Sequence, residues 1–194
     1  VITLALIQCR RWLDEGLELQ VAVNLSPRCI QDAQIVELTR RELARLRVPA
    51  RLLKFEITGG SLVGDTERAV DLMAELADMG VTLSVDDYGT GYSSLSYLKD
   101  LPIHELKIDR SFLTDPAEEA SRRIVRSTVE LGHQLGLRIV AEGVEHPEAI
   151  RELLAIGCDS AQGYYFSEPM PADGLIEWLR ERNPSRRETP TPIG

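Results

Sequence analysis

The chain has 194 residues, of which 43% are hydrophobic and 27% charged, a composition typical of one soluble globular domain with a sizeable core. Its formal net charge of −9 argues against a surface for nucleic-acid polymers or anionic membranes, which needs a basic footprint. No apolar run approaches the roughly 18 residues of a membrane span, and no signal peptide is recognisable. The three cysteines lack metal-ligand spacing. We therefore expect a cytoplasmic protein without membrane contact.

The hydrophobic pattern predicts one helix followed by six repeats of a strand and a helix. The predicted strands cover residues 19–25, 52–57, 81–85, 103–108, 137–141 and 160–166. The predicted helices cover residues 2–14, 31–46, 65–79, about 117–135, 147–155 and 172–182, and one more begins near Leu95. Residues 183–194 contain three prolines and little that is apolar, so we expect one domain over residues 1–182 and a disordered tail or linker after it.

This alternation implies an α/β fold with a parallel sheet, either an open doubly wound sheet or a (β/α)₈ barrel. No Gly-x-Gly-x-x-Gly motif follows the first strand, so a dinucleotide site is unsupported. Polar residues stand at the C-terminal end of every predicted strand, and in a barrel these ends meet at one mouth, where active sites are built. They are Asn24, Glu56, Asp86, Asp87, Lys107, Glu142 and Gln162. This distribution favours the barrel.

Four of these residues, Asn24, Glu56, Asp86 and Asp87, offer only oxygen ligands, and no histidine lies among them. An all-oxygen set favours Mg²⁺, Mn²⁺ or Ca²⁺ over zinc or copper. Adjacent aspartates can serve two metal ions, and paired metals suit phosphodiester hydrolysis. For one strand alone, the favoured interpretation would be a solvated turn in which Asp87 caps the next element. The glycine-rich stretch from Tyr88 onward predicts a mobile loop above the strand end.

The other strand-end residues have alternative roles. Lys107 could orient the nucleophile or neutralise phosphate charge, or it could form a structural ion pair with Asp109 or with one of the paired aspartates. Glu142 could be a metal ligand or a general base, or it could cap the turn at Gly143. Gln162 is expected to hydrogen-bond a ligand edge or a neighbouring site residue.

Six ordered motifs resemble the EAL-domain family of bacterial cyclic di-GMP phosphodiesterases. They are NLS at 24–26, EIT at 56–58, DDYGTGYSSL at 86–95, LKID at 106–109, AEGVE at 141–145 and QGYYF at 162–166. The resemblance implies a (β/α)₈ TIM-like barrel with one antiparallel strand, of which about six of eight strands lie in this chain. It also implies hydrolysis of cyclic di-GMP to linear pGpG with Mg²⁺ or Mn²⁺.

The resemblance also implies roles for individual residues. It makes Asn24, Glu56 and Asp86 ligands of a first metal and Asp87 a ligand of a second. It gives Glu142 a part in metal or water binding, Lys107 a part in activating the water, and Gln162 a supporting role. The loop residues expected to position metal and substrate, and to help form a homodimer, are Tyr88, Gly89, Thr90, Gly91, Ser93 and Ser94. An upstream sensory or diguanylate cyclase domain is expected in the parent chain.

The sequence departs from the family pattern in two places. The Glu-Ala-Leu motif, which the resemblance places on a strand before the first helix, is absent from these residues. Gly59 stands where the family usually has a glutamate that anchors the catalytic loop. We therefore expect an N-terminally incomplete domain with little or no turnover on its own. Two hypotheses follow: a phosphodiesterase, or a degenerate domain that binds cyclic di-GMP or a partner protein without catalysis.

Overall fold

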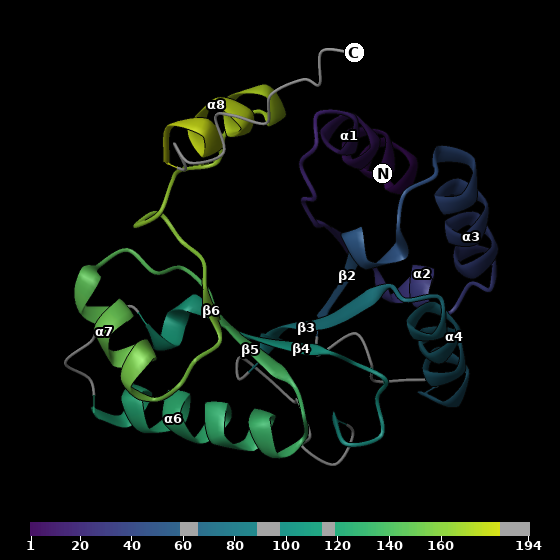
Figure 1. The fold of residues 1–194 in the computed structure, drawn as a ribbon. Coiled ribbons are helices and arrows are strands. Elements are labelled where there is room, and N and C mark those ends of the chain that lie inside the picture. The colour runs from purple at the N-terminus through teal and green to yellow at the C-terminus, as the bar shows by residue number, and fades with distance from the viewer. Residues whose placement is uncertain (59–65, 89–97, 114–118, 183–194) are drawn as a thin grey trace.

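The computed structural model describes residues 1–58, 66–88, 98–113 and 119–182 (Figure 1). The strands are β1 (Val21–Leu25), β2 (Leu53–Thr58), β3 (Thr82–Tyr88), β4 (Glu105–Ile108), β5 (Arg138–Ala141) and β6 (Ser160–Ala161). The α-helices are α1 (Ile2–Asp14), α2 (Pro27–Ile30), α3 (Gln34–Leu46), α4 (Thr66–Asp78), α6 (Glu119–Gln134), α7 (Pro147–Ala155) and α8 (Ala172–Arg182). Within these described ranges, the short 3₁₀ turn η1 (Ala50–Leu52) precedes β2 and η3 (Arg110–Phe112) follows β4.

The six strands form one parallel sheet in the order in which they occur along the chain. A doubly wound sheet would reverse its strand order partway, whereas sequential parallel strands are the arrangement of a barrel. Among the described residues, β1 and β6 pair on one side only, so the sheet is an arc of such a barrel. The expected parallel α/β architecture is confirmed.

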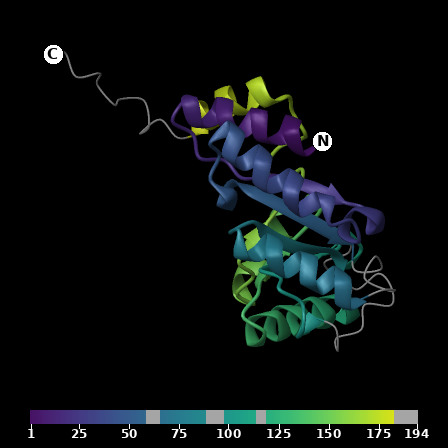
Figure 2. The same ribbon diagram turned by 90° about the vertical axis from the view of Figure 1, so that its right-hand side faces the viewer.

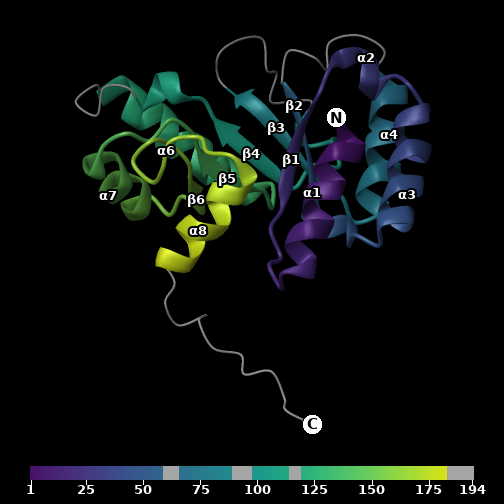
Figure 3. The same ribbon diagram turned by 90° about the horizontal axis from the view of Figure 1, so that it is seen from above.

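The helices follow the outside of this arc, with α1, α3 and α4 on one side, α6 below and α7 on the other side in Figure 1. The two ends of the helical layer, α1 and α8, face one another in Figures 2 and 3. An ion pair joins them, with 3.6 Å between the Arg180 guanidinium and the Glu15 carboxylate. In the described part of the chain, no helix is both long and apolar enough to cross a bilayer.

Alternation along the strands gives the sheet two unlike faces. Phe55, Leu83 and Ile139 are each 0% exposed in the apolar layer beneath the helices. Removing one such side chain from water contributes about 1.5–3 kcal/mol. Because successive strand residues point to opposite faces, the residues between them face the inside of the arc. On this inner face, β2 carries Lys54 and Glu56.

Most predicted elements agree with the structure within two residues, and Gly16, Gly80, Gly136 and Gly157 follow helices with φ between +74° and +88°, as expected for helix stops. The predicted helix over 31–46 is corrected at its start. Pro27 opens a separate helical turn, α2, and α3 begins only at Gln34. The residues of the predicted tail, 183–194, lie outside the described part of the chain.

The prediction of a last strand over 160–166 is wrong beyond Ala161. After β6 the chain leaves the sheet and packs on the segment that follows β5. The Val144 N–H donates to the Gln162 carbonyl at 2.9 Å, and the Tyr165 N–H donates to the Val144 carbonyl at 3.0 Å. A Cβ at Gly163 would collide with the Val144 backbone, so this close approach requires glycine.

Candidate active site

A buried ammonium group lies among three carboxylates at the C-terminal ends of the strands. The Lys107 Nζ is 2.7 Å from Glu142 Oε1, 2.9 Å from Glu56 Oε1 and 3.2 Å from Asp86 Oδ1. These side chains come from β4, the segment after β5, β2 and β3, so only the folded sheet brings them together. We call them the Lys107 cluster.

Lys107 is protonated at neutral pH. Burial of its side chain, which is only 5% exposed, opposes the charged form. Hydrogen bonds to Glu142 and Glu56 outweigh burial and raise the pKa of Lys107 above its ordinary value. Of the structural ion pairs considered from the sequence, the pair with Asp86 forms. Asp109 instead accepts a hydrogen bond from the Ser111 N–H at 3.0 Å, at the start of η3.

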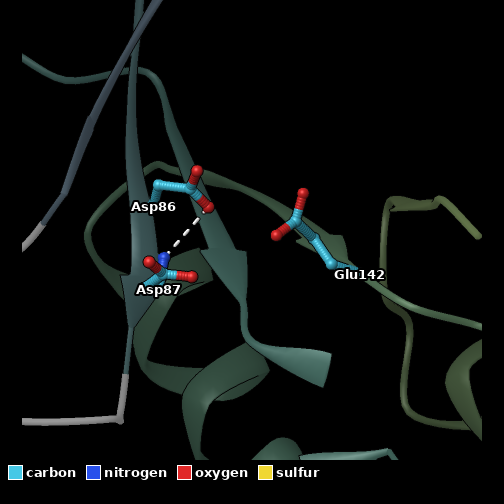
Figure 4. Close-up of side chains that lie close together, drawn as sticks. All are labelled: Asp86, Asp87 and Glu142. Carbon is cyan, nitrogen blue, oxygen red and sulfur yellow. Dashed lines mark hydrogen bonds between the residues drawn. The ribbon is translucent and has the colours of Figure 1, made fainter. Parts of the chain in front are cut away.

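A β-bulge brings the two adjacent aspartates to the same region. The strand continues through both aspartates to Tyr88, and its pairing with β4 shifts between Val85 and Tyr88. Asp87 has a left-handed φ of +55°, and its N–H donates to Asp86 Oδ1 at 3.0 Å (Figure 4). Neighbouring side chains on a regular strand point to opposite faces. The bulge breaks this alternation, so both carboxylates reach the strand end.

Asp86, Asp87 and Glu142 fit a hard divalent cation. Each offers a carboxylate oxygen, and these oxygens lie within 4.8 Å of one another. In Figure 4, Glu142 faces the aspartate pair from the segment that follows β5. Oxygen ligands on opposite sides of Mg²⁺ or Ca²⁺ stand about 4–5 Å apart. Their spacing and oxygen chemistry therefore suit Mg²⁺, Mn²⁺ or Ca²⁺.

Among the described residues, negative charge is in excess at this site, because four carboxylates face one ammonium. Burial, followed by repulsion from Asp86, raises the pKa of Glu142, and Lys107 only partly opposes this effect. Burial, followed by repulsion from Asp86 and Asp109, likewise raises the pKa of Asp87. A bound cation would relieve this repulsion.

The remaining predicted residues lie around this centre or outside the described residues. Asn24 pairs in register with Glu56 at the end of β1, and its side chain is exposed. Gln162 is exposed, and its N–H donates to the Ala141 carbonyl at 2.8 Å, next to Glu142. Tyr88 ends β3, and burial raises its pKa. Outside the described residues lie Gly59, Gly89, Thr90, Gly91, Ser93 and Ser94.

Sequence reasoning missed a second buried ion pair on the inner face. Lys54 Nζ lies 2.5 Å from Glu105 Oε1, and the Ser84 hydroxyl donates to the same oxygen at 3.2 Å. The sequence does contain a signal for this pair. Lys54 stands two residues before Glu56, and Glu105 stands two residues before Lys107, so each lies on the same face of its strand as a cluster residue.

Comparison with known proteins gives a consistent result. A family model described as EAL domain matches residues 1–169. The bifunctional diguanylate cyclase/cyclic di-GMP phosphodiesterase MucR of Pseudomonas aeruginosa is 44% identical over 172 residues, which cover 87% of this chain and 25% of that protein. The chain spans about a quarter of the length of the curated relatives it matches.

Solved structures show the same fold. The PaMucR phosphodiesterase in complex with c-di-GMP superposes with a TM-score of 0.84 at 41% identity, covering 90% of this chain and 71% of that one. The EAL domain of Mycobacterium smegmatis DcpA gives a TM-score of 0.87 at 34% identity, covering 92% and 82%. The arc of six strands therefore corresponds to a large part of a TIM-like domain.

Proposed function

This chain belongs to the EAL domain family, and we propose that it forms part of a domain that hydrolyses cyclic di-GMP to linear pGpG with Mg²⁺ or Mn²⁺. The observation that carries the proposal is the convergence of four carboxylates and one buried ammonium at the C-terminal ends of neighbouring parallel strands. Relatives with matching sequence are named cyclic di-GMP phosphodiesterases, which supports the choice of substrate.

We assign the oxygen donors to two cations. Asn24, Glu56 and Asp86 would hold the first, and Asp87 the second, while Glu142 would serve the metals or the attacking water. The bound cations would supply the positive charge that activates water and stabilises the departing oxygen. All of these donors are carboxylate or amide oxygens, which is the ligand chemistry such ions prefer.

The chain's own residues divide the remaining work. Lys107 holds its proton, so it donates hydrogen bonds, fixes the orientation of the carboxylates and adds positive charge near the phosphate. Glu142 hydrogen-bonds Lys107 and lies close to the aspartate pair, so it would take a proton from the attacking water. Gln162, on the neighbouring turn, would hydrogen-bond substrate or a site residue.

The assembly is also part of the proposal. We infer a cytoplasmic homodimer that uses the loop over residues 87–94 and, in a longer parent chain, an upstream sensory or diguanylate cyclase domain. The length of the curated relatives, about four times that of the matched segment, supports additional domains.

A second function is favoured by one feature of the sequence. Gly59 offers no carboxylate to anchor the catalytic loop. A domain with that departure could bind cyclic di-GMP or a protein partner without turning it over. We keep this module as the alternative to the enzyme.

Measurement of pGpG separates the two functions. The 194-residue chain, and a fusion that adds an N-terminal EAL-domain segment bearing Glu-Ala-Leu, are incubated with cyclic di-GMP and Mn²⁺, and the nucleotides are resolved by chromatography. We expect pGpG from the fusion and little from the chain alone. A fusion that binds cyclic di-GMP without forming pGpG would instead support the binding module.

A further inference from the structure

Two ion pairs connect β2 to β4 across the strand between them, and the lysine is on β2 in one pair and on β4 in the other. The inner face of β2 carries a lysine and then a glutamate, Lys54 and Glu56, whereas that of β4 carries a glutamate and then a lysine, Glu105 and Lys107. Lys54 pairs with Glu105, and Glu56 pairs with Lys107. Since β2 and β4 are not neighbours in the sheet, both pairs cross the inner face of β3.

The two pairs differ in charge balance. The Lys54–Glu105 pair is matched one to one, and both side chains are largely buried, at 16% and 7% exposed. The Lys107 cluster carries surplus carboxylates. The Lys54–Glu105 pair, which has no net charge, therefore lies beside the Lys107 cluster, which has a net negative charge. Ser84, on β3, donates a hydrogen bond to Glu105.

Lys54 would have another partner if Glu105 did not hold it. Residues two apart on a strand lie about 6.6 Å apart on the same face, a distance that a four-carbon lysine side chain can span. The nearest inner-face carboxylate on its own strand is that of Glu56. A second ammonium at Glu56 would compete with a divalent cation for the carboxylates of the cluster.

We propose that Glu105 is a positioning residue, which holds the Lys54 ammonium away from Glu56 and so keeps the surplus carboxylate charge available to the divalent cation. The inference rests on the proposed metal site and extends it to residues two positions below the cluster. It assigns Glu105 no contact with metal or substrate. Lys54, the group that Glu105 restrains, is the competing cation.

The proposal predicts different effects on divalent-cation affinity for the two partners. Glu105→Gln frees Lys54 to turn toward Glu56, so it weakens divalent-cation binding. Lys54→Met removes the competing cation, so binding is equal to wild type or tighter. If the pair were purely structural, both substitutions would change Mn²⁺ affinity in the same direction, because loss of either partner leaves the other buried and unpaired.

The test measures Mn²⁺ affinity of the 194-residue chain by calorimetry, at a temperature where circular dichroism shows each variant folded. We expect Glu105→Gln to weaken Mn²⁺ binding by at least about tenfold, given an added unit charge a few ångströms away. Lys54→Met should not weaken it, and the double variant K54M/E105M should bind within about threefold of wild type.

Two further variants complete the design. Glu18→Gln removes the carboxylate of the exposed pair with Arg51, in which the two groups lie 2.7 Å apart, and so matches the net-charge change without the burial. It should leave Mn²⁺ affinity unchanged. If Glu105→Gln does not fold, Glu105→Asp replaces it, since its shorter side chain loosens the hold on Lys54 and should weaken binding in the same direction.

Equal weakening by Glu105→Gln and Lys54→Met, no change in either, or no Mn²⁺ binding by the wild-type chain would each overturn the proposal. The measurement uses no substrate, so it is separate from turnover. Wild-type Mn²⁺ binding with opposite responses of the two variants, but no pGpG from the fusion, would overturn the proposed enzyme while supporting the role of Glu105.

Discussion

The two faces of the sheet are made by the same strands and have opposite chemistry. Under the helices, β2 presents Phe55 and Ile57, both 0% exposed. On the inner face, the same strand presents Lys54 and Glu56, which join two ion pairs. Parallel sheets are usually apolar on both faces. Residues on the helix-facing side therefore stabilise the fold, whereas the alternate residues on the inner face form the candidate cation site. Substitutions on the first face should change stability, and substitutions on the second should change cation binding.

The largest effect on stability should come from the helix-facing side. Phe55→Ala leaves a cavity in the core and should lower the free energy of unfolding by about 3–5 kcal/mol. Urea denaturation followed by circular dichroism measures this, and Mn²⁺ affinity of the folded fraction should stay at the wild-type value. A loss below about 1 kcal/mol would contradict the division between the faces.

Asp86→Asn tests the inner face with an isosteric change. The carboxylate belongs to both the Lys107 cluster and the cation-fitting triad, so Mn²⁺ affinity should fall at least about tenfold. Stability should be unchanged or higher by up to about 1 kcal/mol, because a like charge is removed from beside Asp87 and Glu142. Calorimetry and urea denaturation of the same samples check both effects. Stability loss on the scale of Phe55→Ala would contradict the comparison.

Two substitutions of Asp87 can separate the effect of its backbone conformation on stability from the effect of its charge on cation binding. Asp87→Gly and Asp87→Ala both remove the carboxylate, and both should weaken Mn²⁺ binding. At φ +55° alanine is strained, whereas glycine is not, so Asp87→Gly should be more stable by about 1–2 kcal/mol. Thermal unfolding of the two variants measures the difference. Equal stabilities would mean that the bulge relaxes when the carboxylate is lost.

The smallest expected effect on stability is at the N-terminal end of β5, away from the cation site. The Asp159 carboxylate accepts the Ile139 N–H at 2.8 Å and contacts His133 at 2.9 Å. Burial tends to raise the pKa of Asp159, but these contacts outweigh it and lower the pKa. Asp159 therefore stabilises the fold above its unfolded pKa, and this contribution is lost as pH falls through the lower, folded value.

Asp159→Asn should lower the free energy of unfolding by less than about 1 kcal/mol at pH 7, because a third of the side chain is exposed and screened. The difference from wild type should shrink as pH falls below the folded pKa. Urea titrations at several pH values between neutral and strongly acid follow this change. A difference that is constant across that range would show that the charge of Asp159 is not what stabilises the strand.

Sequence reasoning succeeded where local pattern determines the structure. The positions of Glu56, Asp86, Lys107 and Glu142 at the ends of predicted strands placed them at one end of a parallel sheet, and the structure brings them within ion-pair distance. The helix ends before Gly16, Gly80, Gly136 and Gly157 agree with the predicted ranges, because glycine itself tolerates the left-handed φ that closes a helix.

The features that were missed depend on contacts between distant segments. The bulge at Asp87 follows from pairing with β4, which the sequence of β3 alone does not contain. The Lys54–Glu105 pair joins residues 51 positions apart. The last strand ends early because Gly163 packs on Val144, an approach that periodicity cannot show.

The three carboxylate partners of Lys107 have one more consequence. An ammonium group has three N–H donors, and three carboxylate oxygens already lie within 3.2 Å of the Lys107 Nζ. A phosphate oxygen can engage this lysine only after a carboxylate has turned away, and a divalent cation attracts the same carboxylates. Cation and phosphate should therefore bind with positive thermodynamic coupling, each raising the affinity for the other by the same factor.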